Sequence, residues 1–205
     1  MTDELNLQDF PFKWVISDTH FSHVNILKFE ADKRPFHSID QMNGELIRRW
    51  NRVVAPEDPI LHLGDLSLGV LESSLPLTTA LNGRRYLVPG NHDRISSVFN
   101  GGKNRERFLP MYEDAGWTIL PEVFRARLAG RGVQVSHFPY AGDSRSDRPD
   151  RHVDARPVDD GSPLIHGHVH SEFATRGRMF NVGVDVRNLA PTPVSEIVDW
   201  LGRLA

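Results

Sequence analysis

The sequence contains no cysteine in 205 residues. This absence excludes disulfides, thiolate zinc sites, iron–sulfur clusters and thiol nucleophiles, so a metal ion would need His, Asp, Glu, Asn or backbone oxygen ligands. Long apolar runs are absent as well. The run at residues 14–16 ends at once in Ser17 and Asp18, and no run approaches the roughly 18 residues of a membrane span. The sequence therefore predicts no membrane association.

An excess of charge of one sign is also lacking, since 24 Lys and Arg stand against 27 Asp and Glu, for a formal net charge of −3. This balance provides no basic field for duplex nucleic acid, although a short oligonucleotide stays open. Residues 1–10 carry acid where a secretory leader carries Lys or Arg, and no apolar segment follows them. We therefore expect a cytoplasmic, intracellular protein, with residues 1–205 forming one domain.

Short apolar runs alternate with segments of helical periodicity, which favours an α/β fold with added β-hairpins. The expected strands span residues 12–17, 59–63, 86–88, 123–128, 133–136, 163–165 and 179–184. Ser38 and Gln41 have the spacing of a capping box and predict a helix with Met42, Leu46 and Trp50 on one face. At the C-terminus, Thr192 is the expected N-cap of a last helix.

Residues 142–161 break this pattern, because they include four Arg and six Asp but almost no large apolar side chain. Such a composition predicts a loop. A solvated insertion and a lid over an anionic ligand are both open interpretations.

Polar residues follow the expected strands at the points where the strands end. They are Asp18, His20, Asp65, Asn91, His92, Asp93, His137, His168 and His170. Each alone is most simply a turn residue, but side chains at neighbouring strand ends converge on one crevice in open α/β sheets. In extended backbone, residues two apart point to the same side, so Asp18 with His20, and His168 with His170, should each face one point.

In chain order, these residues form the blocks Asp-x-His, Gly-Asp, Gly-Asn-His-Asp, His and Gly-His-x-His, which resemble the five signatures of the calcineurin-like metallophosphoesterases. The segments 18–26, 34–36 and 61–65 further resemble a compact branch of predicted phosphoesterases from bacteria and phages. The resemblance implies a two-sheet β-sandwich flanked by helices, with a dinuclear metal centre at the strand ends.

The resemblance also implies roles for individual residues. One metal would be held by Asp18, His20 and His170, the other by Asn91, His137 and His168, with Asp65 between them. Imidazole, carboxylate and amide ligands without thiolate suit two Mn²⁺, Fe or Zn²⁺ ions, and Mn²⁺ is the first expectation in vitro. A metal-bridging hydroxide would attack phosphorus, and His92 would protonate the leaving group.

The sequence departs from the family pattern at Leu68, where many members carry an Asp that orients the catalytic histidine. Asp93 is therefore a candidate for orienting His92. For the other histidines, we expect a supporting or structural position for His62 and His166 and a surface position for His37 and His152.

Three residues are candidate substrate contacts, namely Arg34, His23 and Asn25, and the arginines of the loop could also hold the substrate. Surface ion pairs or a polar turn would explain the same residues. The favoured function is hydrolysis of a small phosphodiester such as a cyclic nucleotide. The alternatives are a phosphomonoesterase acting on a small phosphorylated metabolite or nucleotide, a nuclease, and a non-catalytic scaffold of the same fold.

Overall fold

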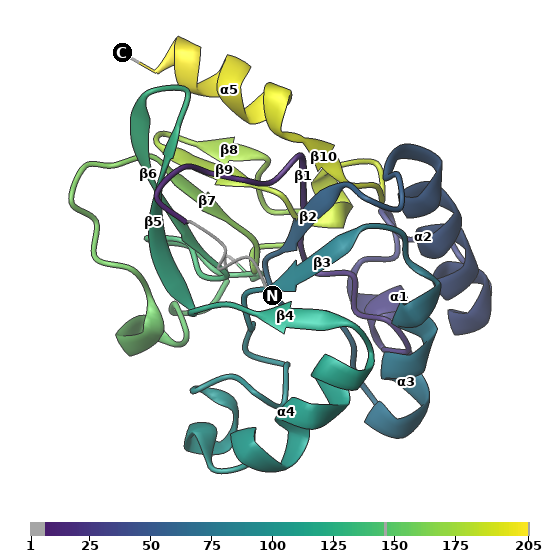
Figure 1. Cartoon of the computed structure of the whole chain (residues 1–205). Helices are drawn as coiled ribbons and strands as arrows, with labels where there is room; N and C mark the ends of the chain where they lie inside the picture. The colour runs from purple at the N-terminus through teal and green to yellow at the C-terminus, as the bar shows by residue number, and fades with distance from the viewer. Residues whose placement is uncertain (1–6, 146, 205) are drawn as a thin grey trace.

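The computed structural model describes residues 7–145 and 147–204, so residues 1–6 of the N-terminal segment discussed above lie outside it. Two five-stranded sheets form its centre (Figure 1). The first has the order β10-β1-β2-β3-β4, with β1 (Trp14–Ile16), β2 (Pro59–His62), β3 (Arg84–Leu87), β4 (Trp117–Ile119) and β10 (Thr192–Pro193). The second has the order β5-β6-β7-β9-β8, with β5 (Val123–Leu128), β6 (Arg131–Ser136), β7 (Leu164–His166), β8 (Thr175–Arg176) and β9 (Met179–Asn181). The predicted two-sheet architecture is confirmed.

The direction of the strands explains where the polar residues gather. Strands β1 to β4 run parallel to one another, as do β6, β7 and β9. Parallel strands carry their carboxyl ends to the same edge of a sheet. Side chains such as Val15, Leu61, Val135 and Phe180 fill the space between the sheets, and burial contributes about 1.5–3 kcal/mol for each large apolar side chain.

Helices cover the outer face of the first sheet (Figure 1). They are α1 (Ile26–Phe29), α2 (Ile39–Val53), α3 (Leu71–Leu77) and α4 (Arg105–Asp114). The hydroxyl of Ser38 accepts the Gln41 N–H at 3.1 Å, as predicted. The Gln41 side chain, however, accepts the N–H of His37 at 2.8 Å, so the reciprocal bond of a capping box is made one residue earlier. Short 3-10 helices lie at Thr78–Ala80, Phe99–Gly102, Val153–Ala155 and Val184–Val186.

The predicted start of the last helix is wrong. Thr192 and Pro193 form β10 and pair with Val15 and Trp14 at the edge of the first sheet. Helix α5 (Val194–Arg203) begins after them and has no side-chain cap. The cap pattern predicted that residues 192 and 193 start the helix, but their backbone pairs with the otherwise open edge of β1.

The loop at residues 142–161 makes contacts with the second sheet. Gln134 of β6 donates to the Val158 carbonyl at 2.9 Å and to Asp160 at 2.8 Å. Asp143 is buried. The segment is a loop, as predicted, but a fully solvated insertion is excluded by these contacts. No helix in the described parts of the chain is long and apolar enough to cross a membrane.

Candidate metal centre

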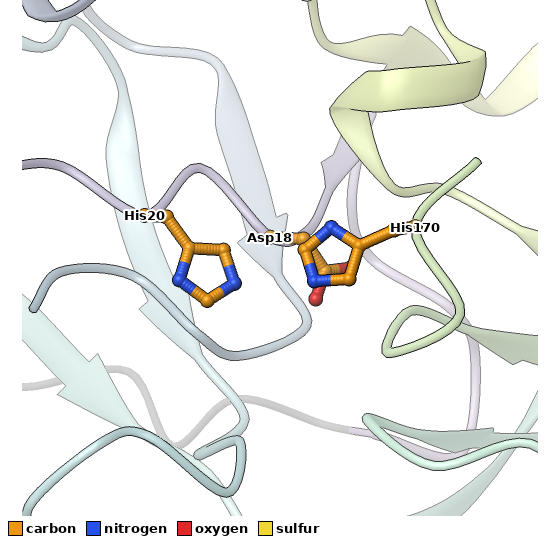
Figure 2. A group of neighbouring side chains, drawn as sticks. All are labelled: Asp18, His20 and His170. Atoms are coloured by element: carbon orange, nitrogen blue, oxygen red, sulfur yellow. The ribbon is translucent and has the colours of Figure 1, made fainter. Parts of the chain in front are cut away.

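Most of the predicted ligands meet at the carboxyl ends of the strands. Ligand atoms of Asp18, His20 and His170 lie within 4.8 Å of one another, and so do those of Asp18, Asp65 and His137. Figure 2 shows Asp18, His20 and His170 brought together from the segments that follow β1 and β7. All five side chains are buried. The predicted convergence therefore holds for these residues.

The backbone reason for this convergence differs from the prediction. Asp18, His20, Asp65, His168 and His170 have φ values of 58°, 50°, 55°, 71° and 46°, so they are left-handed and not extended. Left-handed backbone costs roughly 1–2 kcal/mol for a residue with a Cβ and gathers at functional sites. His168 and His170 consequently diverge. The ring of His170 stacks on His20 at 5.0 Å, whereas the ring of His168 meets His137 edge-on at 5.2 Å.

Two glycines allow the ligand segments to approach so closely. A Cβ on Gly90 would collide with Asp65, including its backbone nitrogen at 2.5 Å. A Cβ on Gly167 would collide with Ser17 and lie 2.5 Å from Asp18 Oδ2. Only glycine fits at these positions, because real Cβ contacts below about 3 Å are essentially never found.

His170 is held by a carboxylate that the sequence analysis missed. Its Nδ1 donates to Asp185 Oδ2 at 2.8 Å, which leaves Nε2 as the ligand atom. Burial lowers the pKa of His170, but the Asp185 hydrogen bond and the charges of Asp18 and Asp185 outweigh it and raise the pKa to about 9. Asp185 follows β9 at yet another strand end, and this position was the available sequence signal.

Arg34 does not contact the site as a substrate ligand, and that prediction is wrong. Its guanidinium is buried and binds Asp185 through Nε at 2.6 Å and Nη2 at 2.9 Å. The remaining donors bind the carbonyls of Asp18 and Thr19 and the sulfur of Met42. All five donors are therefore used inside the protein, and Arg34 positions the Asp18 segment and Asp185 instead.

The second group of ligands contains acceptor atoms that face one another. His137 donates Nδ1 to the Leu63 carbonyl at 2.7 Å, so its Nε2 carries a lone pair. That Nε2 lies 3.1 Å from Asn91 Oδ1 and 3.7 Å from Asp65 Oδ2. Three buried acceptors so close together repel one another unless a cation lies among them. The donor set therefore fits a divalent metal.

His20, on the other side of Asp65, also presents a buried nitrogen that fits a metal ligand. Its Nε2 is buried, has no hydrogen-bond partner among the described residues, and lies 3.5 Å from Asp65 Oδ2. Burial, together with the neighbouring His170 and His92, holds the pKa of His20 well below its usual value. A neutral imidazole is the form that binds a metal.

His168 lies beside the second group but outside both ligand clusters. Its backbone N–H donates to Asp18 Oδ2 at 3.0 Å, and its Nε2 lies 3.4 Å from Asp143 Oδ2. Asp143, from the loop at 142–161, is in turn held by Arg151 at 2.6 Å. Asp143 thus lies next to His168, but the 3.4 Å separation is longer than the 2.8 Å hydrogen bond from His170 to Asp185. The position of Asp143 was not predicted, because the sequence of the loop indicated only its charge composition.

His92 stands at the edge of the centre. Its backbone N–H donates to Asp65 Oδ1 at 2.8 Å, while its ring Nε2 is 4.0 Å from Asp65 Oδ2 and 40% of its side chain is exposed. Asp93 does not orient this ring, and that prediction is wrong. The Asp93 carboxylate accepts the N–H groups of Asp65 and Gly90 at 2.8 Å each, and so fixes the backbone around Asp65.

The remaining histidines divide as follows. His62 is fully buried, accepts the Gly64 N–H at 3.1 Å and contacts Thr19 Oγ1 at 2.9 Å, which fits a structural position. His166 is fully buried and its Nδ1 contacts the Gly167 carbonyl at 2.7 Å. His37 is exposed. His152 is partly exposed, and its ring packs 5.4 Å from Phe138 and 6.1 Å from His168.

A cavity of about 560 Å³ opens beside the ligands, with His20, His92 and His170 in its wall. His23 also lines it and contacts His20 through the two Nδ1 atoms at 3.2 Å. Asn25 is exposed at the start of α1 and is not among the lining residues. The structure therefore places one of the three candidate substrate contacts, His23, at this cavity.

Comparisons with known proteins agree with this geometry. A family model described as calcineurin-like phosphoesterase superfamily domain matches residues 14–191, a span that includes every predicted ligand. The Gene 66 proteins of Mycobacterium phages L5 and D29 are 31% and 33% identical, and each alignment covers 84% of this chain and 86% or 87% of the relative. A solved structure of a protein of unknown function, AQ665 from Aquifex aeolicus, matches with a TM-score of 0.68 and 26% identity, covering 91% of this chain and 97% of that one.

Proposed function

Because the chain belongs to the calcineurin-like phosphoesterase superfamily, a superfamily of hydrolases with Asp and His metal ligands, we propose that it is a two-metal phosphodiesterase. Its substrate is a small diester such as a cyclic nucleotide. The observation that carries the proposal is the set of mutually facing acceptors around Asp65, which lies within 4.0 Å of the side chains of His20, His137 and His92. Divalent cations bound there would neutralise phosphoryl oxygens and lower the pKa of an attacking water.

The residues of the chain have separate tasks in this proposal. Asp65 offers oxygens to both ligand groups, since its Oδ2 faces His20 on one side and His137 on the other. His92 acts as the general acid. Its half-exposed imidazole lines the cavity, where it can pass a proton to a departing alkoxide, and its backbone is tied to Asp65.

Arg34 is not available as a clamp for the dianion of a monoester, whereas Arg145 and Arg151 do line the cavity. A terminal phosphoryl dianion needs more positive charge than a diester, and one of the arginines expected to supply it is turned into the protein. The cavity beside the ligands, about 560 Å³, offers room for a second ester arm. A phosphomonoesterase is the alternative outcome of the test.

The test is turnover by the Mn²⁺-loaded protein of bis-p-nitrophenyl phosphate and p-nitrophenyl phosphate, followed by 2′,3′- and 3′,5′-cyclic nucleotides. We expect a higher kcat/KM for the bis ester under one metal and pH. A monoester value equal to or above it overturns the diester preference. Absence of turnover on the whole panel, with metal bound, favours the scaffold alternative.

Two relatives are phage proteins, and we propose the cytoplasm of a bacterial host as the place of action. The choice of Mn²⁺ rests on the nitrogen and oxygen ligand set. Metal analysis of protein purified without added metal tests it against Fe and Zn²⁺.

A further inference from the structure

The cavity beside the ligands has a basic wall that the metal centre does not use. Lys28, Arg145 and Arg151 line it, opposed by one carboxylate, Glu30. We propose that this wall is a subsite for a second anionic group on the substrate, a phosphate or carboxylate at the far end of the ester arm. The proposal rests on the proposed phosphoesterase function and narrows the substrate class to a phosphodiester with a further negative charge on one ester arm, which a simple cyclic nucleotide lacks.

Two of the cations are available to a ligand. Lys28 of α1 has no carboxylate within 4.0 Å in the part of the chain that the structure describes. Arg145 pairs only with Asp147 at 2.9 Å among the described residues, and the two side chains are 56% and 63% exposed. This pair uses Nε and Nη2 of Arg145 in a bidentate contact with Asp147, at 3.0 and 2.9 Å, so Nη1 is the donor that it leaves for an anion in the cavity.

The third cation is fixed in place. Arg151 binds both oxygens of Asp143 through Nε and Nη2, and Nη2 also donates to Ser144 Oγ at 3.1 Å. None of these bonds uses Nη1. Because Asp143 is buried against His168, this arrangement ties the basic wall to the metal centre and orders Arg151 before a ligand arrives.

The other two arginines of the loop do not belong to this wall. The Arg156 side chain is 4% exposed and donates to the Gly142 carbonyl at 2.9 Å. Arg148 is exposed and does not line the cavity. The structure thus selects Arg145 and Arg151 from four arginines of similar sequence context.

Part of the cavity wall is apolar. Ile26 and Phe29 of α1 line the cavity, and Phe29 is 70% exposed, which is unusual for a large apolar side chain next to a polar site. Its ring lies 6.1 Å from that of His23. Carbon atoms that join two anionic groups can pack against this surface, while the two ends meet the metals and the basic wall.

The test compares two aryl diesters that differ in the second arm. Methyl p-nitrophenyl phosphate has a neutral arm, and 2-carboxyethyl p-nitrophenyl phosphate has an anionic one. For the Mn²⁺-loaded protein, we expect kcat/KM to favour the anionic arm by roughly 10-fold or more, as for one charge-assisted contact. The double variant Lys28→Gln, Arg145→Gln should lose most of this ratio, whereas Arg107→Gln, an exposed arginine of α4, should keep it.

Equal kcat/KM values for the two substrates overturn the subsite, and so does a ratio that survives in the double variant. If neither ester is hydrolysed, the proposed function fails while the subsite is still tested by binding. In calorimetry, 2-carboxyethyl methyl phosphate should then bind the wild-type protein more tightly than dimethyl phosphate, and the double variant should bind both alike. Equal binding to the wild-type protein overturns the proposal.

Discussion

The Nδ1 of His170 donates to Asp185 Oδ2 at 2.8 Å, and this single bond decides which nitrogen of His170 can meet a metal. Asp185 is itself locked by both ends of the Arg34 fork. Carboxylates that hold a metal-binding histidine typically affect metal affinity by 10–100-fold, since they fix the tautomer and the ring orientation.

The first prediction follows for Asp185→Asn. The variant should bind Mn²⁺ about 10- to 100-fold more weakly at the group that includes His170. Calorimetric titration of metal-free protein measures this affinity. Asp159→Asn, which removes an exposed carboxylate paired with Arg178, is the matched control. Unchanged affinity in a variant that still unfolds cooperatively would show that Asp185 does not position His170.

The second prediction concerns the number of ions. Elemental analysis of Mn²⁺-reconstituted protein should give two ions per chain, and Asp65→Asn should reduce the content at both positions. The reason is that Asp65 Oδ2 lies between His20 and His137, at 3.5 and 3.7 Å. One tightly held ion that survives the substitution would contradict the two-metal centre.

The convergence of several candidate ligands could be predicted from the sequence because it depends on where the strands end. Wherever a short apolar run stops at Asp, Asn or His, the parallel strands carry that residue to a common edge, and Asp18, Asp65 and His137 meet there as expected. The same rule would have found Asp185 after β9. The left-handed backbone of Asp18 and His170 was not predictable, because it is imposed by neighbouring segments that bond across the site.

Contacts between residues far apart in the chain could not be predicted from the sequence pattern. Arg34 and Asp185 are separated by 151 positions, so the same arginine could equally have faced a substrate or the interior. Asp143 met His168 only through the fold of an irregular loop. Thr192 lies at a position typical of an N-cap, but its backbone pairs with Val15 at the edge of β1 instead.

The third prediction separates an acid from a ligand. His92→Ala should keep its metal content while slowing esters with alkyl leaving groups far more than p-nitrophenyl esters, because p-nitrophenolate departs without a proton. Rates on both ester types and metal analysis check this. His37→Ala, which removes an exposed histidine, should change neither. Equal losses on both types would contradict the acid role, and loss of metal would make His92 a ligand.

The fourth prediction uses two glycines in different surroundings. In Gly90→Ala, the new methyl would strike Asp65, so we expect loss of bound metal and a lower unfolding temperature. Gly44→Ala in α2 adds its methyl where no atom lies within 4 Å, and it should raise stability by roughly 0.5–1 kcal/mol. Calorimetric unfolding and metal analysis compare the two. Normal metal content in Gly90→Ala would show that the backbone near Asp65 can give way.

The last prediction concerns pH and the buried His62. Burial and the nearby His137 lower the pKa of His62 to about 3, against an ordinary value of 6.5. As the pH falls below 6.5, His62 becomes protonated in the unfolded chain but stays neutral in the folded protein. The free energy of unfolding therefore decreases by up to about 1.4 kcal/mol per pH unit until the pH nears 3.

The substitution His62→Gln replaces this titrating side chain with one that does not titrate. At pH 7.5, the variant should be less stable by about 1–3 kcal/mol, because the hydrogen bonds that His62 makes with Gly64 and Thr19 are disturbed. Between pH 6.5 and 4, the deficit should shrink, since only the wild-type protein carries the His62 penalty, while the other histidines act equally in both proteins. Urea unfolding in EDTA at stepped pH measures the difference. A deficit that stays constant over this range would mean that His62 can take up its proton in the folded state.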